Sequence, residues 1–530
     1  MLKHPGEKKS IKYMPSSSII LFKTDINQES IQIYLVKRRE DLKFFPGQYA
    51  GIGGKVEKSD KIFANFLHKK IFPTYQESEL NSLVCAWREL FEEVGICLLK
   101  NLSESKTLGM KDFVKTKQNI DMTELFNQFD LNYLDLEFER FFSSGIRTTP
   151  EFAYSVFITQ FYMVSLDNCA QKPVIDNNNH ELSDGLWDSP KNLFKRFMQN
   201  KLDTPPPVLG VIRELAERDI IFPDGHKFNV PFQALEILNQ NNLLPIGLQT
   251  KIEVVPGIQI IPFRTRTIAP AYTTNLIIIG ALECLIVDPG TNNENELNRL
   301  DQIIEYLLVE RRKIKGILLT HHHLDHREAI KHLTNKFNFS VYLSQKCYDQ
   351  IEEKGEYEQR IIIADNEVIN LGIDRENGLE WNLKVLELPG HTKGHVCLLD
   401  QRFNTLIAGD IVSGIGTVII DDYKEYMNSL ERLQKLEVGM ILPGHGPMVK
   451  RGHKLINDYI IHRKLREKQI ITALDKKIGK TPKEIVEEVY TDVPVSFHLF
   501  AEQQVNVYLK YFEQENLIFF NPTEEKYFKS

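Results

Sequence analysis

Four histidines and one aspartate lie within the six residues from His321 to His326. They follow an apolar run, ILLT at 317–320, which predicts a strand, so they occupy the loop at its carboxyl end. Burying several unpaired imidazoles and a carboxylate costs a large desolvation free energy, whereas neutral imidazole and carboxylate are the ligands that zinc prefers. The run therefore predicts an α/β fold with a metal site at the strand ends.

Three further candidate ligands each stand in a glycine-rich turn after an apolar run. They are His391 in LPGHTKGH, Asp410 in LIAGD and His445 in ILPGHGP. A single glycine-flanked histidine is more often a turn residue than a ligand. Together with the run at 321–326, however, these residues indicate one site built from several loops.

The length of 530 residues argues for more than one domain. We expect a first domain at 1–225, a linker at 226–249, a second domain at 250–450 and a C-terminal domain at 451–530. With 42% hydrophobic and 26% charged residues, the composition is that of a globular protein. Apolar runs alternate with helical patterns over 250–450, which predicts sheets covered by helices. Amphipathic helices are expected at 452–476, 482–490 and 497–516, before a hairpin-like tail.

A second candidate site lies on a helix expected at 82–94, with Gly95 as its C-terminal cap. The preceding stretch, 61–81, has no clear period. Glu89, Glu92 and Glu93 project from one face of this helix, and Arg88 can pair with Glu92 one turn away. Mg²⁺ or Mn²⁺ would relieve the repulsion between the carboxylates. The alternative is a solvated acidic face.

Residues 88–96, RELFEEVGI, together with Gly53-Gly54, resemble the signature of the Nudix hydrolases. Asp60 stands where that signature has a glutamate, and 27 residues separate it from Arg88. The resemblance covers about 15–220 and implies an α/β/α domain that hydrolyses a nucleotide or coenzyme A diphosphate. It also implies that Glu89, Glu92 and Glu93 bind Mg²⁺ or Mn²⁺, with Glu92 and Glu93 as catalytic candidates.

The pattern H-x-H-x-D-H at 321–326, with Asp288 in CLIVDPG, resembles the metallo-β-lactamase superfamily, and more closely its glyoxalase II-like branch. The resemblance implies an αββα sandwich with two zinc ions per chain, and Asp325 is also our catalytic candidate. The implied roles are one zinc on His321, His323 and His391, the other on Asp325, His326 and His445, Asp410 as the bridge, and supporting roles for Asp288 and His395.

Residues 250–530 include DDYKEYMNSLERL at 421–433, PGHGPMV at 443–449 and HRKLREKQII at 462–471. With these segments they are similar to the β-lactamase-like protein 2 group, whose members are regarded as single-strand endoribonucleases with a winged-helix-like C-terminal domain. Residues 450–468 carry seven Lys and Arg against two acidic residues, a local charge of +5. Arg463, Lys464 and Arg466 are therefore candidate contacts to an RNA backbone. The alternative is a solvated basic face.

We thus expect a multidomain α/β and α+β protein that acts as a zinc-dependent hydrolase on single-stranded RNA. Two other functions stay open, a glyoxalase II-like thioesterase and a nucleotide- or RNA-binding module with weak Nudix chemistry. Net charge of −7 excludes a global polyanion-binding surface. Without a long apolar run or paired cysteines, we expect no membrane contact and a cytosolic protein, with the mitochondrion as the alternative.

Overall fold

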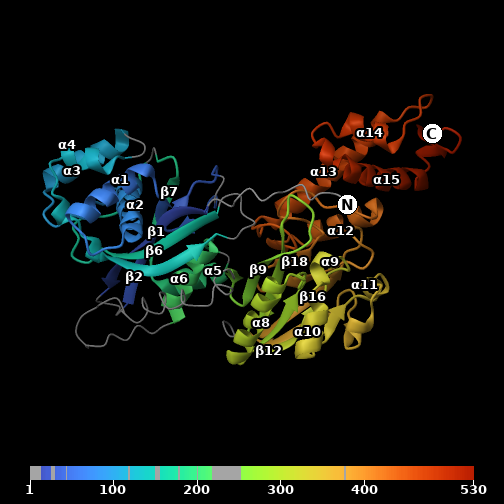
Figure 1. Cartoon of the computed structure of the whole chain (residues 1–530), viewed down its shortest axis with the longest axis horizontal. Helices are drawn as coiled ribbons and strands as arrows, with labels where there is room; N and C mark the ends of the chain where they lie inside the picture. Colours follow the sequence, from blue (N-terminus) through green and yellow to red (C-terminus); the bar gives the residue numbers. More distant parts are fainter. Residues whose placement is uncertain are drawn as a thin grey trace. The chain divides into compact units, whose positions relative to one another are not determined.

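The chain forms two compact units, residues 1–252 and 253–530 (Figure 1). The computed structural model describes residues 13–25, 30–42, 45–116, 120–149, 156–176, 179–199, 201–217, 252–374 and 378–530. The linker expected at 226–249 lies outside these ranges. No helix within them is long and apolar enough to cross a bilayer.

The N-terminal unit is built on one mixed sheet. Its strands run in the order β3-β2-β1-β6-β5, with β4 paired to β1 and β7 to β2. Only β1 and β6 are parallel among these pairs. The strand bounds are β1 Tyr13–Asp25, β2 Ser30–Arg38, β3 Tyr49–Ala50, β4 Ile52–Lys55, β5 Phe141–Thr148, β6 Val156–Ser165 and β7 Leu182–Asp188.

Helix α2, Glu77–Val94, carries the acidic residues and packs through Leu83, Trp87 and Leu90 into the core of this unit. Gly95 ends it with φ of 68°, which confirms the predicted cap. The helix starts five residues earlier than the apolar period predicted, because its first turn is polar. The stretch 61–81, which has no clear apolar period, includes most of a further helix, α1. The helix bounds are α1 Lys58–Lys70, α3 Glu104–Thr116, α4 Met122–Gln128, α5 Pro190–Met198 and α6 Pro206–Glu217.

The second unit contains two large sheets. One runs β14-β13-β12-β11-β10-β9-β8 and the other β15-β16-β17-β18-β19. Every residue of β10, β17 and β18 is buried, so both faces of each sheet are covered. The bounds are β8 Ile252–Val255, β9 Ile258–Arg264, β10 Thr273–Gly280, β11 Glu283–Val287, β12 Lys313–Leu318, β13 Val341–Leu343, β14 Arg360–Ile362, β15 Val368–Ile373, β16 Glu380–Glu387, β17 Val396–Asp400, β18 Thr405–Gly409 and β19 Met440–Pro443.

Helices connect these strands, as the alternating pattern predicted. Asn293 caps the longest of them, α8, by accepting from two backbone N–H groups of its first turn. Figure 1 shows α8 and α10 beside the strand β12. The bounds are α8 Glu294–Val309, α9 Leu324–Arg327, α10 Ile330–Phe337, α11 Gln345–Asp349 and α12 Tyr423–Lys435.

The C-terminal segment folds as three helices and a hairpin, close to the ranges expected from the sequence. Its hydrophobic core is continuous with that of β16–β18 and α12, since one cluster runs from Leu386 through Tyr426 to Phe512. The multidomain mixed α/β class is thereby confirmed. The bounds are α13 Gly452–Ala473, α14 Pro482–Val489, α15 His498–Gln514, β20 Ile518–Asn521 and β21 Lys526–Lys529.

The shared core leads to a stability prediction for Phe512→Ala. Because the ring is fully buried, its loss should lower the free energy of unfolding by about 3–5 kcal/mol. Denaturant unfolding followed by far-UV circular dichroism measures this. Lys510→Ala, an exposed site on the same helix, serves as control and should stay close to the parent protein. An equally small effect of Phe512→Ala would contradict the shared core.

Candidate metal centre

All seven candidate ligands follow strands of the second unit, in loops, in turns or on one short helix. His321 and His323 come after β12, and the short helix α9 carries Asp325 and His326. The remaining three follow β16, β18 and β19, and they are His391, Asp410 and His445. The ends of two sheets thus bring together residues that are up to 124 positions apart in the sequence.

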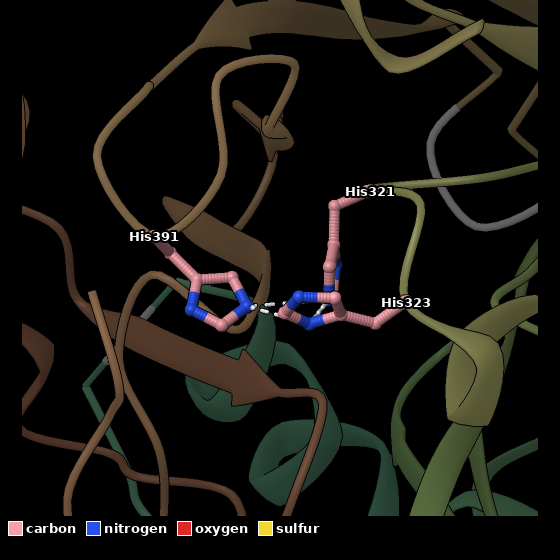
Figure 2. Close-up of side chains that lie close together, drawn as sticks. All are labelled: His321, His323 and His391. Atoms are coloured by element: carbon pink, nitrogen blue, oxygen red, sulfur yellow. Dashed lines mark hydrogen bonds between the residues drawn. The ribbon is translucent and has the colours of Figure 1, made fainter. Parts of the chain in front are cut away.

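Three of the histidines converge on one point (Figure 2). His323 Nδ1 lies 3.0 Å from His321 Nε2 and 3.2 Å from His391 Nε2, and the two Nε2 atoms are 3.3 Å apart. In a tetrahedral zinc site with Zn–N distances of about 2.0–2.1 Å, ligand nitrogens lie roughly 3.3–3.4 Å apart. The spacing of the three nitrogens therefore fits one tetrahedrally coordinated cation.

A second group of side chains lies beside the first. His445 Nε2 is 3.4 Å from an oxygen of Asp325, 3.2 Å from one of Asp410 and 3.3 Å from His326 Nε2. Asp410 Oδ2 is also 3.9 Å from His391 Nε2, so this carboxylate faces both groups. Its other oxygen, Oδ1, is buried without a hydrogen-bond partner in the described part of the chain. An orphaned buried carboxylate oxygen is costly unless a cation binds it.

The carboxylate of Asp288 accepts hydrogen bonds from both ends of the segment 320–326, which carries four of the candidate ligands. Its Oδ1 accepts from the Thr320 N–H at 2.8 Å, and its Oδ2 accepts from the Thr320 hydroxyl at 2.6 Å and from His326 Nδ1 at 2.9 Å. The bond to Nδ1 turns His326 Nε2 toward Asp410, which fits the supporting role expected for Asp288. His395 Nε2 accepts from the Asp410 N–H at 3.1 Å, so His395 holds the backbone of this residue.

Sequence reasoning missed three groups that orient ligands. Thr320 bridges Asp288 and His321, whose Nδ1 lies 3.0 Å from the Thr320 hydroxyl. The carbonyls of Ile419 and Thr273 accept from His391 Nδ1 at 2.6 Å and His445 Nδ1 at 2.9 Å. Thr320 could have been found from its place directly before His321. The two carbonyls carry no sequence signal, because every residue has one.

Burial and neighbouring charges give the histidines of the two groups different pKa values. Burial lowers the pKa of His391 to about 4 and that of His321 well below its usual range. Burial also opposes the charge on His445, but the negative charge of Asp410 and the hydrogen bonds to Asp325 and Asp410 together outweigh it and raise the pKa of His445 to about 10. The three-histidine group therefore presents neutral nitrogen lone pairs, and the neighbouring group presents carboxylate charge.

Three overlapping sets of three ligand atoms in this centre are compact enough to hold a metal ion. They are His321, His323 and His391; His321, His326 and Asp410; and Asp325, His326 and His445. Lone pairs at such separations repel one another unless a cation lies between them. The donors present thus fit divalent metal ions of the zinc type.

Two of the three candidate carboxylates of α2 are buried and the third, Glu92, is partly buried, which argues against a solvated acidic face. Glu89 and Glu93 are 9% and 8% exposed. Arg88 Nη1 donates to Glu89 at 2.9 Å and to Glu92 at 2.8 Å, which confirms the expected pair with Glu92. The other side of the guanidinium binds Asp60 through two bonds of 2.8 and 2.9 Å.

This cluster places one buried cation among several carboxylates. Burial raises the pKa of Glu89 to about 7 and that of Glu93 well above its usual range. Glu93 also accepts from the Gly53 N–H at 3.2 Å, so the glycine pair lies next to the helix. Within the described residues, these glutamates do not form a set of three ligand atoms as compact as those of the histidine centre. Their binding of Mg²⁺ or Mn²⁺ stays a prediction.

Two of the three expected RNA contacts point inward, which corrects that expectation. Arg463 is 4% exposed and donates to the Val418 carbonyl. Arg466 is 7% exposed and donates to the Val489 carbonyl at 2.8 Å. Neither guanidinium is free to neutralise a phosphate. Lys464 is exposed and lies 3.8 Å from Glu431.

Comparison with known proteins agrees with this geometry. Residues 270–445 match the model of the metallo-beta-lactamase superfamily. Residues 481–524, which span α14, α15 and β20, match a beta-lactamase associated winged helix domain.

Individual relatives match about half of the chain. The chain is 30% identical to a beta-lactamase-like protein 2 homolog of Caenorhabditis elegans over 241 residues, 45% of this chain and 77% of the relative. It is 27% identical to an atrochrysone carboxyl ACP thioesterase of Aspergillus fumigatus, covering 45% of this chain and 75% of that protein. A metallo-beta-lactamase family protein of Thermus thermophilus aligns with 20% identity and a TM-score of 0.43, covering 52% of this chain and all of that one.

The support that Asp288 gives to His326 leads to a prediction for Asp288→Asn. We expect metal affinity to fall about 10–100-fold, because the amide cannot hold both Thr320 and His326 as the carboxylate does. Competition with a zinc chelator measures it. Asp301→Asn is the matched control, since Asp301 accepts from His332 at 2.7 Å outside the centre. Equal affinities of the two variants would refute the role of Asp288.

Proposed function

The chain belongs to the metallo-β-lactamase superfamily, among the beta-lactamase-like protein 2 homologues, and we propose that its second unit is a binuclear zinc endoribonuclease. The superfamily itself points to a metal-dependent hydrolase. One observation carries the proposal of a loaded metal centre, namely the converging histidine nitrogens and carboxylates with the unpaired oxygen of Asp410.

The chain's own residues prepare this reaction. His321, His323 and His391 would hold one ion, and Asp325, His326 and His445 the other, with Asp410 between them. When bound, such ions activate water near neutral pH and stabilise negative charge on the attacked group. Because only Asp325 and Asp410 contribute carboxylates, two divalent ions would leave the site positive. An anionic phosphodiester suits that charge.

The choice of single-stranded RNA rests on the resemblance of 250–530 to the β-lactamase-like protein 2 group. The charge of the site is compatible with it. The buried Arg463 and Arg466 leave Lys464 as the exposed member of the expected backbone contacts.

Asp410→Asn tests this function. We expect cleavage of a mixed-sequence RNA oligomer to fall by about 100-fold or more, since the two metal ions would lose an anionic ligand that they share. Cleavage is followed on denaturing gels with protein preloaded with Zn²⁺, and a duplex of the same sequence should be cut more slowly. Asp301→Asn should cleave like the parent. RNA cleavage that survives Asp410→Asn would exclude this centre as its source.

A thioesterase is the second candidate function. It is favoured by the similarity of this unit to a protein named as an acyl carrier protein thioesterase. Rates on S-lactoylglutathione and on an RNA oligomer, at matched enzyme concentration, separate the two. A fast thioester rate that Asp410→Asn abolishes, without RNA cleavage, would replace our proposal.

For the first unit we propose Mg²⁺-dependent hydrolysis of a nucleotide or coenzyme A diphosphate. The supporting observation is the hydrogen bond from the Gly53 N–H to Glu93, one of the buried carboxylates of α2. An excess of buried carboxylates over the one guanidinium of Arg88 is the setting in which a hard cation binds.

Glu92→Gln should lower Mg²⁺-dependent hydrolysis of a diphosphate panel by about 100-fold, because a carboxylate that would hold the ion is lost. Phosphate release with and without Mg²⁺ measures it. Glu79→Gln, an exposed position on the same helix, is the control. Equal background rates for parent and Glu92→Gln would show that the fold is retained without this chemistry.

A further inference from the structure

The loop 411–422, between β18 and α12, carries a backbone group that orients one proposed ligand. The Ile419 carbonyl accepts a hydrogen bond of 2.6 Å from His391 Nδ1. Since a carbonyl can only accept, the proton lies on Nδ1 and the lone pair of Nε2 faces His321 and His323 (Figure 2). The place of one carbonyl thus determines the tautomer and direction of His391.

Both neighbours of Ile419 are held by side chains of the C-terminal helices. Gln504 on α15 accepts from the Ile420 N–H at 3.1 Å and donates to the Ile420 carbonyl at 3.1 Å. Arg463 on α13 donates to the Val418 carbonyl. The peptide groups on either side of Ile419 are therefore tied to two different helices.

Gln504 is unusual for its position, because it lies 9% exposed in an otherwise apolar core beside Val505 and Tyr508. A buried amide is costly unless both its oxygen and its nitrogen are bonded. Here both atoms bind Ile420, as a peptide group of a neighbouring strand would. Both side-chain hydrogen bonds of Gln504 therefore go to the loop.

The start of the loop is held in the same way. The Ser413 N–H donates to the Tyr459 hydroxyl of α13 at 3.0 Å. The next residue, Gly414, donates to the His445 carbonyl at 2.9 Å. The C-terminal helices therefore hold the loop at both places where it touches proposed ligands.

We infer that Gln504 is a positioning residue of the metal centre, acting through Ile420 and Ile419 on His391, with Arg463 and Tyr459 as partners. This inference rests on the proposed metal centre. In this way the helices α13 and α15 of the C-terminal segment help to orient a histidine of the three-histidine group.

Gln504→Leu in the full chain tests the inference, since it keeps the volume and removes both bonds to Ile420. We expect affinity for Co²⁺ to fall about tenfold or more, in the range for lost supporting bonds. The Co²⁺ absorption spectrum should also change, because the ligand field at the three-histidine group depends on His391. Gln503→Leu, on the exposed side of α15, is the matched control and should bind Co²⁺ like the parent.

Thermal unfolding of the metal-free proteins separates positioning from stability. A residue with a purely structural role would lower the melting temperature and leave Co²⁺ affinity and spectrum unchanged, and that result overturns the inference. If Gln504→Leu does not fold, Gln504→Asn replaces it, because its shorter side chain cannot bond both groups of Ile420. Failure of the parent itself to bind Co²⁺ would instead refute the proposed metal centre.

Discussion

The centre depends on holding the lone pairs of three histidine nitrogens close together while they repel one another, beside the carboxylates of Asp325 and Asp410. Each ligand can bear this only if a second hydrogen bond fixes it from behind. Asp288 does so for His326, and the carbonyls of Thr273 and Ile419 do so for His445 and His391. Thr273 begins the buried strand β10, and Asp288 and Ile419 lie in loops that follow the buried strands β11 and β18. The rigidity of the two sheets is therefore what makes the ligand geometry available.

The sequence reveals ligands more readily than their supports. The ligands were predictable because imidazoles and carboxylates seldom gather in turns after buried strands unless they bind a metal ion. The supports were not, since Ile419 and Thr273 act through backbone carbonyls that any residue would offer. Asp288 was predictable because it directly follows the apolar run CLIV, and Thr320, which donates to Asp288, could have been found from its place directly before His321.

The number of basic residues in a segment does not show which of their side chains face solvent and which face the core. Arg463 and Arg466 were expected to face solvent because the surrounding segment is basic. They continue the buried stripe of α13 that includes Tyr459 and Ile470, at the helical spacing of three and four residues. That periodicity could have shown that both are internal. For the carboxylates of α2 the sequence left a metal-binding face and a solvated face open, and the structure buries Glu89 and Glu93 beside Arg88.

The hydrogen bonds from the C-terminal helices to the loop 411–422 also have a consequence for biosynthesis. Gln504 lies on the last long helix, so during ribosomal synthesis the ligands from His321 to His445 emerge well before the residue that braces His391. A nascent chain would expose an incompletely ordered metal site until α15 leaves the exit tunnel. The support of His391 by the C-terminal helices would then be completed late in synthesis, after all seven proposed ligands have been made.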